Sequence, residues 1–69
     1  MAQQLSKKTA KTISQKINTL FVCESMVDDF RLEKNHEKCK YYMTRYNETC
    51  DELMSQFGIE VIKYKNAAL

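Results

Sequence analysis

The chain has 69 residues, one glycine, no proline and a formal net charge of +2. A chain of this length forms a single domain, residues 1–69, and one copy buries only a small core. The scarcity of turn residues excludes a fold of many short strands, and a charge of +2 is too small to indicate nucleic-acid binding by itself.

A first helix is predicted over about residues 8–32. Its apolar residues recur at helical spacing on one stripe, which comprises Ile13, Ile17, Leu20 and Val27. Ser6 or Thr12 is expected to cap the helix, and Thr12 with Gln15 matches the capping-box pattern.

A second helix is predicted over about residues 36–57. Its apolar residues follow alternating steps of four and three: Cys39, Met43, Tyr46, Cys50, Leu53 and Phe57. Tyr42 and Met54 widen this stripe. Asn35 is expected to cap the start of the helix and Gly58 its end.

Two helices are favoured over one because the second stripe is rotated by roughly 80° from the extrapolated first stripe. The alternative is one unbroken helix that pairs with a second chain. The segment after Gly58, "IEVIKY" at 59–64, is expected to form a short strand or an extension that packs back over the helices.

The charged residues alternate in blocks, which predicts antiparallel packing. A turn near residue 34 brings the lysine-rich start of the chain beside Glu48, Asp51 and Glu52. The same turn brings an acidic block beside a basic one, formed by Glu24, Asp28 and Asp29 and by Lys38, Lys40 and Arg45. We therefore predict an all-α helical hairpin that dimerises into a four-helix arrangement.

The three cysteines are expected to be free thiols in a reducing, cytoplasmic environment, because the chain shows no signal-peptide pattern. Cys39 and Cys50 lie three helical turns apart, about 16 Å, too far for a disulfide. His36 and Cys39 supply only two of the four ligands of a structural zinc site.

No catalytic, metal or cofactor site is predicted. His36 is the only histidine, and one glycine is too few for a phosphate-binding loop. No membrane span is expected, because no stretch approaches the roughly 18 apolar residues that spanning requires.

A protein interface is predicted on the first helix, because residues 20–32 carry apolar side chains on more than one face. The predicted interface residues are Phe21, Val22, Met26 and Phe30. Self-association, coverage by the C-terminal extension and a foreign partner are the three alternatives for what covers them.

A nucleic-acid surface is the alternative on the second helix. Lys34, Lys38, Tyr41 and Arg45 follow one line of its outer side. Because this line continues into Glu48 and Glu52, which repel phosphates, we regard it as the second hypothesis.

Glu24 lies within the apolar stripe of the first helix, almost in line with Leu20 and Val27. Its carboxylate either reaches water or forms a buried polar link, with Arg45 as the nearest basic partner. These observations favour a non-enzymatic protein-interaction module, a small regulator or inhibitor of the kind that phages and plasmids encode. Its expected partner is another protein or itself, as a homodimer, with no small-molecule substrate. A nucleic-acid-binding regulator and a structural subunit of a larger assembly are the alternatives.

Overall fold

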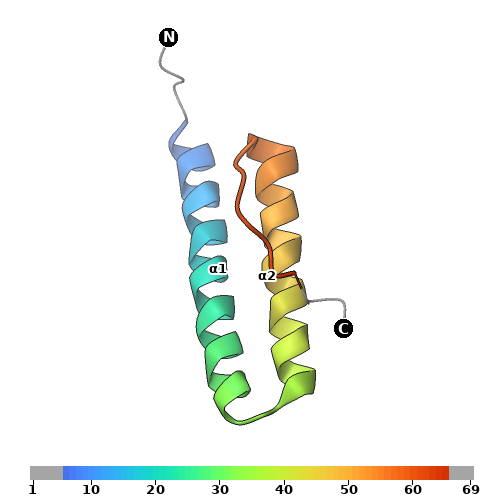
Figure 1. Ribbon diagram of the computed structural model, residues 1–69. Helices are drawn as coiled ribbons and strands as arrows, with labels where there is room; N and C mark the ends of the chain where they lie inside the picture. The colour runs from blue at the N-terminus through green and yellow to red at the C-terminus, as the bar shows by residue number, and fades with distance from the viewer. Residues whose placement is uncertain (1–5, 66–69) are drawn as a thin grey trace.

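The structure is a computed structural model that describes residues 6–65. Helix α1, Lys7–Leu32, and helix α2, His36–Phe57, pack side by side in opposite directions (Figure 1). The molecule measures 47 × 18 × 14 Å. An unbroken helix would form a rod of roughly 75 Å, so the predicted hairpin is confirmed.

Helix α1 begins where a serine satisfies its first free amides. The Ser6 hydroxyl accepts a hydrogen bond from the Thr9 backbone N–H at 3.0 Å. Thr12 lies inside the helix, where its hydroxyl donates to the Lys8 carbonyl at 3.1 Å. Of the two predicted caps, Ser6 is therefore the right one, and the capping box at Thr12 is wrong.

The turn between the helices forms without glycine or proline. Lys34 adopts the left-handed backbone conformation, with φ of 58°. Asn35 then caps α2 as predicted, because its side-chain oxygen accepts from the Lys38 N–H at 3.2 Å. The Asn35 N–H itself donates to the Phe30 carbonyl at 2.9 Å, which closes the turn on α1.

Gly58 ends α2 as the sequence predicts. Its φ of 67° and ψ of 22° are left-handed, a conformation in which a side chain is strained. The N–H groups of Gly58 and Ile59 donate to the carbonyls of Met54 and Leu53 at 2.9 and 3.1 Å. These bonds satisfy the last free carbonyls of the helix and turn the chain back on itself.

The core lies between the two predicted stripes. Its buried residues are Leu20, Cys23 and Val27 of α1 and Cys39, Thr49, Cys50 and Leu53 of α2. Val27 and Leu53 have no exposed surface. Met54, which was expected to widen the second stripe, is half exposed instead.

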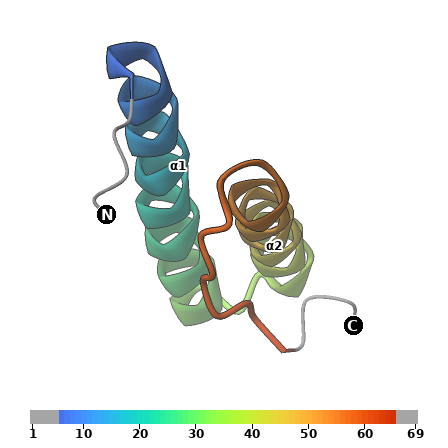
Figure 2. The same ribbon diagram turned by 90° about the horizontal axis from the view of Figure 1, so that it is seen from above.

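Residues 59–65, which we call the tail, run back along the helix pair towards the turn (Figures 1 and 2). Within the described residues the tail forms no strand. Ile59 and Val61 pack against a cluster of Leu20, Cys50 and Leu53. Of the two expectations for this segment, packing over the helices is the correct one.

The charge blocks meet in part as predicted. Lys16 of α1 pairs with Glu52 of α2 at 3.4 Å. Asp51 pairs instead with Lys63 of the tail, at 2.9 Å. The charge blocks predicted that Asp51 would lie beside the lysines at the start of α1, but its ion pair is with the tail.

Candidate interaction surfaces

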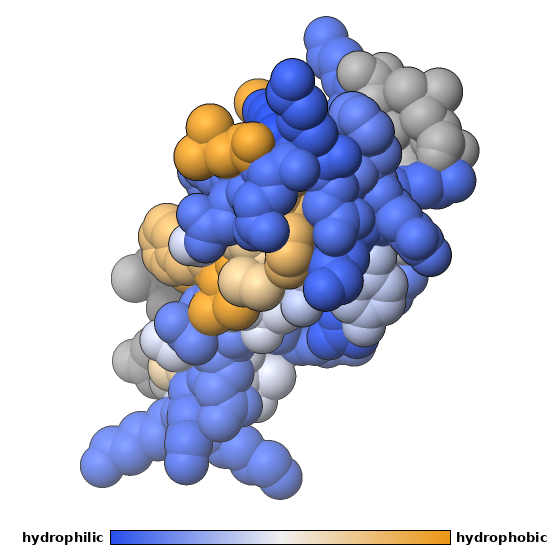
Figure 3. All heavy atoms as spheres, turned by 90° about the horizontal axis from the view of Figure 1, so that it is seen from below, coloured by the Kyte–Doolittle hydropathy of each residue, from blue (hydrophilic) through white to orange (hydrophobic). Residues whose placement is uncertain are grey.

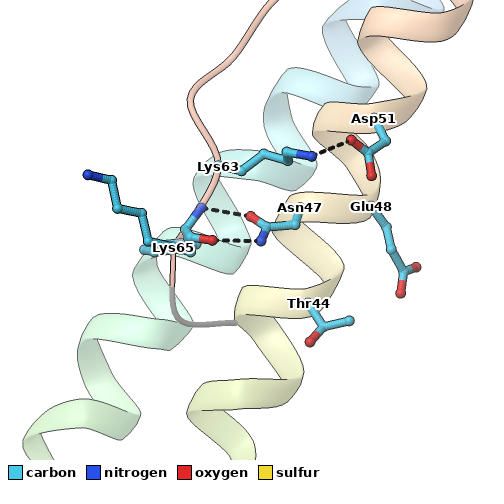
Figure 4. A pocket seen from close by; sticks show the side chains of 7 residues that line it. Thr44, Asn47, Glu48, Asp51, Lys63 and Lys65 are labelled. Atoms are coloured by element: carbon cyan, nitrogen blue, oxygen red, sulfur yellow. Dashed lines mark hydrogen bonds and ion pairs between the residues drawn. The ribbon is translucent and has the colours of Figure 1, made fainter. Parts of the chain in front are cut away.

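The tail is attached to α2 through the side chain of Asn47. The Asn47 amide nitrogen donates to the Tyr64 carbonyl at 2.9 Å, and the Tyr64 N–H donates to the Asn47 side-chain oxygen at 2.8 Å. Figure 4 shows this pair of bonds together with the bond from Lys63 to Asp51. One amide side chain therefore satisfies both polar groups of a residue in the extended tail.

Side chains add to this attachment. The Tyr64 ring meets the Tyr46 ring edge to face, with centroids 4.8 Å apart. Burial raises the pKa of Tyr64, and the nearby carboxylates of Glu24 and Asp28 raise it further. The hydrogen bond to Asp51 raises the pKa of Lys63.

The tail covers one side of the helix pair. Glu24 of α1 lines a hollow together with Tyr46, Ile62 and Tyr64, so its side chain lies on the side of the tail. Val22 and Met26 lie two residues before and after Glu24 and therefore point about 160° away from it. Met26 therefore lies on the opposite side, which no described segment crosses (Figure 2), whereas Val22, which is also about 160° from the buried Leu20, lies at the outer edge of that side.

On that opposite side the two helices share an aromatic cluster. Phe30 stacks on Tyr42 with centroids 5.7 Å apart, and Tyr41 meets Tyr42 edge to face at 5.0 Å. The Lys38 ammonium lies 5.1 Å from the centre of the Phe30 ring. We call this surface the uncovered face and define it by six residues: Val22, Met26, Phe30, Lys38, Tyr41 and Tyr42.

The structure divides the predicted protein interface. Val22, which is 51% exposed, and the half-buried Met26 and Phe30 follow one row on the uncovered face. Phe21, which is 67% exposed, precedes Glu24 by three residues and lies at the tail side of α1. Seen from the turn, the surface is mostly hydrophilic, with some hydrophobic side chains exposed among the charged ones (Figure 3).

The predicted nucleic-acid line is exposed along its length, but its members have different environments. Lys34 lies in the turn, Lys38 over the Phe30 ring, and Tyr41 is 56% exposed. Arg45 is exposed on the next turn of α2. Further along, Glu52 is engaged by Lys16.

The proposed buried link between Glu24 and Arg45 is wrong. Both residues are exposed, because Glu24 lies at the edge of the stripe where its carboxylate reaches water. Arg45 lies near the Cys23 thiol instead and lowers its pKa, although burial outweighs this effect and raises the pKa overall.

All three cysteines are buried and free, as expected. Burial raises the pKa of Cys50 as well, and the Cys39 thiol donates to the Val27 carbonyl at 3.8 Å. Among residues 6–65 no group of three or more histidine, cysteine or acidic side chains is placed to hold a metal ion. Neither described helix is long and apolar enough to cross a membrane.

The attachment at Asn47 was not predicted from the sequence. The only nearby indication in the sequence is that Asn47 directly follows the stripe residue Tyr46. This places Asn47 at the side of α2, between the core-facing and the fully exposed residues. Its partner Tyr64 is 17 residues away, so the contact depends on the turn at Gly58. Comparison of the chain with protein-family models, curated proteins and solved structures finds no match.

Proposed function

We propose that this protein is a non-enzymatic interaction module of the cytoplasm, a small regulator or inhibitor that acts by binding another protein surface. The observation that carries the proposal is the uncovered face. Apolar and aromatic side chains gather there on the one side of the helix pair that no described segment covers. Patches of this kind on small proteins mark interaction sites.

The composition of the uncovered face supports protein binding. Aromatic and methionine side chains are enriched at the centres of protein interfaces. Phe30 and Tyr42 are held in place by stacking, so they lose little conformational freedom on binding. Val22 extends this surface along α1, away from the turn.

A second copy of the chain is the first partner that we propose for this face. The face is formed by side chains of both helices and lies along the long axis of the molecule, which measures 47 Å, so a second hairpin can lie against it lengthwise. Two such faces in contact form the four-helix arrangement that the stripes predict.

Charge supports the same arrangement. Asp29 is exposed two helical turns after Val22, at the α1 edge of the uncovered face. Lys38 and Arg45 are exposed on α2. A two-fold axis that lays α1 of one copy beside α2 of the other brings these opposite charges together.

The chemistry of the described residues supports a role without catalysis. His36 is exposed at the first residue of α2, and the nearest thiol in sequence, Cys39, is buried. The Cys23 and Cys50 thiols are buried with raised pKa values, which disfavours the reactive thiolate. Free thiols also agree with the proposed cytoplasmic location.

The test is the double substitution Val22→Glu with Met26→Glu. By sedimentation equilibrium, the wild-type chain should have twice its mass of 8.1 kDa at micromolar concentrations. The double variant should have the mass of one chain, because two carboxylates in a desolvated contact cannot be accommodated.

The matched control is Ser14→Glu with Ser25→Glu, which adds the same charge at exposed positions on the outer side of α1. This control should remain dimeric. A wild-type mass of one chain would exclude the second copy as the partner. A dimer that survives the Val22 and Met26 substitutions would exclude the uncovered face as its interface.

A further inference from the structure

Free thiols make up a large part of the small core. The described chain buries three of them: Cys23 of α1 and Cys39 and Cys50 of α2. Its other buried residues are Leu20, Val27, Thr49 and Leu53. A close-packed interior accepts a thiol but has no room for a larger group on the same sulfur. The packing of this hairpin therefore depends on thiols that carry no adduct.

Cys50 is the thiol that the tail covers. It belongs to the core cluster on which Ile59 and Val61 of the tail pack. Together with Val61 and Lys63 it also lines a hollow between α2 and the tail. Because its side chain is buried, a reagent reaches the sulfur only after the tail has moved away.

The other two thiols are covered by the opposite helix. The Cys39 thiol donates to the Val27 carbonyl of α1 at 3.8 Å, and Cys23 lies close to Arg45 of α2. The core cluster under the tail contains neither of them. Exposure of Cys23 and Cys39 therefore requires α1 and α2 to separate, which is a larger opening than release of the tail.

We propose that the hairpin is a redox-sensitive fold: release of the tail exposes Cys50 to a low-molecular-weight disulfide, and the mixed disulfide that forms prevents the tail from packing again. The Cys50 thiolate attacks one sulfur of the reagent and forms a new S–S bond to it. The S–S bond of the reagent breaks, and its other half leaves as a thiolate, which takes up the proton that Cys50 has lost. Cys50 is thereby oxidised and the departing half is reduced.

Release of the tail changes both the reactivity of Cys50 and the stability of the hairpin. Burial is the main cause of the raised pKa of Cys50, so release also favours the thiolate. Once the adduct has formed, it occupies the space into which Ile59 and Val61 pack. Loss of these contacts lowers the stability of the whole hairpin, because a chain of this size buries few side chains. The uncovered face lies on the other side, so the inference does not depend on the proposed function.

The experiment treats the full chain with oxidised glutathione and identifies each modified cysteine by peptide mapping and mass spectrometry. Cys50 should react before Cys23 and Cys39. The chain modified at Cys50 alone should have a lower urea midpoint than the untreated chain, as followed by circular dichroism. Dithiothreitol should restore the midpoint, because thiol exchange removes the adduct.

Urea and two substitutions distinguish release of the tail from unfolding of the hairpin. Below the unfolding transition, modification of Cys50 should accelerate only slightly with urea, and modification of Cys39 steeply, because the dependence scales with the surface exposed. Asn47→Ala removes the bonds that attach the tail and should accelerate modification of Cys50 about tenfold. Asn35→Ala removes the cap of α2 but not the tail contacts, so it should accelerate modification of Cys39 about fivefold and leave Cys50 unchanged.

Ser55→Cys is the matched control, because it adds a thiol at an exposed position of α2. This thiol should react first, and the chain modified there alone should keep its urea midpoint. Equal rates with equal urea dependence at Cys23, Cys39 and Cys50 would overturn the inference, since unfolding of the whole hairpin would then expose all three. An unchanged midpoint after modification of Cys50 would also overturn it.

Discussion

At the scale of single residues, the interior of the hairpin contains ionisable groups that are kept neutral. Cys23 and Cys50 are 3% and 2% exposed, and burial raises the pKa of both thiols. Burial also raises the pKa of Tyr46. Such groups make the stability of the fold depend on pH in the alkaline range.

Stability should fall as the pH rises above about 9. In the unfolded chain the thiols ionise near their ordinary pKa of 9.0, whereas in the folded chain they remain protonated to higher pH. Their contribution is therefore complete below pH 9 and is lost as the pH rises through the folded pKa values. The urea midpoint should be lower at pH 10 than at pH 7.

Cys50→Ala provides the control, because it removes one of the two thiols at similar volume. Its urea midpoint should change less between pH 7 and pH 10 than that of the wild-type chain. Equal midpoints of the wild-type chain at both pH values would contradict the burial of these thiols.

At the scale of elements, the local signals for helices and caps were sufficient. The helix ends are capped by Ser6, Asn35 and Gly58. Each forms its capping hydrogen bond with a residue three or four positions away, so the local sequence is enough to predict the cap. Thr12 with Gln15 matches a capping-box pattern, but both residues lie inside a helix that begins at Lys7. Whether residues 59–64 form a strand or pack over the helices depends on contacts such as the one between Asn47 and Tyr64, which are 17 residues apart. The spacing of apolar residues in the sequence does not predict such contacts.

The end of α2 allows a direct test at this scale. Gly58→Ala should reduce the free energy of unfolding by about 1 kcal/mol, because a side chain disfavours the left-handed conformation. A Cβ at this position would have nothing within 4 Å, so the cost arises from the backbone and not from a clash. Urea unfolding followed by circular dichroism measures the difference.

Gly58→Asn should cost less than Gly58→Ala, since asparagine adopts this conformation more readily. If the two variants were equally destabilised, the backbone explanation would be incorrect. Unchanged stability in both would show that α2 does not end in this turn.

At the scale of the whole molecule, the two sides of the helix pair differ in what covers them. The sequence predicted that residues 20–32 have apolar side chains on more than one face, and the structure shows where each lies. The sequence does not predict which side of the helix pair the tail covers. Phe21 and Val22 are adjacent, point in different directions and are both apolar, so the tail could have packed on either of them. The positions of Asn47, Tyr46 and Asp51 on α2 decide this, through their bonds and contacts with the tail.

The distribution of charge at this scale argues against nucleic-acid binding. The net charge is +2, and acidic Glu48 and Glu52 follow the basic line of α2. We expect no measurable affinity for a labelled oligonucleotide at about 150 mM salt, where phosphate contacts are strongly screened. Fluorescence anisotropy across a range of salt concentrations tests this expectation.

Neutralisation of Lys38 and Arg45 by glutamine is the comparison for the salt titration. If the wild-type chain bound with a strong salt dependence, and this dependence decreased in the double variant, the nucleic-acid hypothesis would replace the protein-binding one. Binding at low salt that the double variant retains would indicate nonspecific attraction by other lysines.

The attachment of the tail at Asn47 has a consequence for how the sequence can change over generations. Because Asn47 bonds to the backbone of residue 64, the two hydrogen bonds are compatible with many side chains at that position. On the α2 side, few residue types offer a donor and an acceptor together on one short side chain. Substitutions should therefore accumulate faster at the exposed tail positions, Glu60 and Ile62, than at position 47, which holds the backbone of the tail.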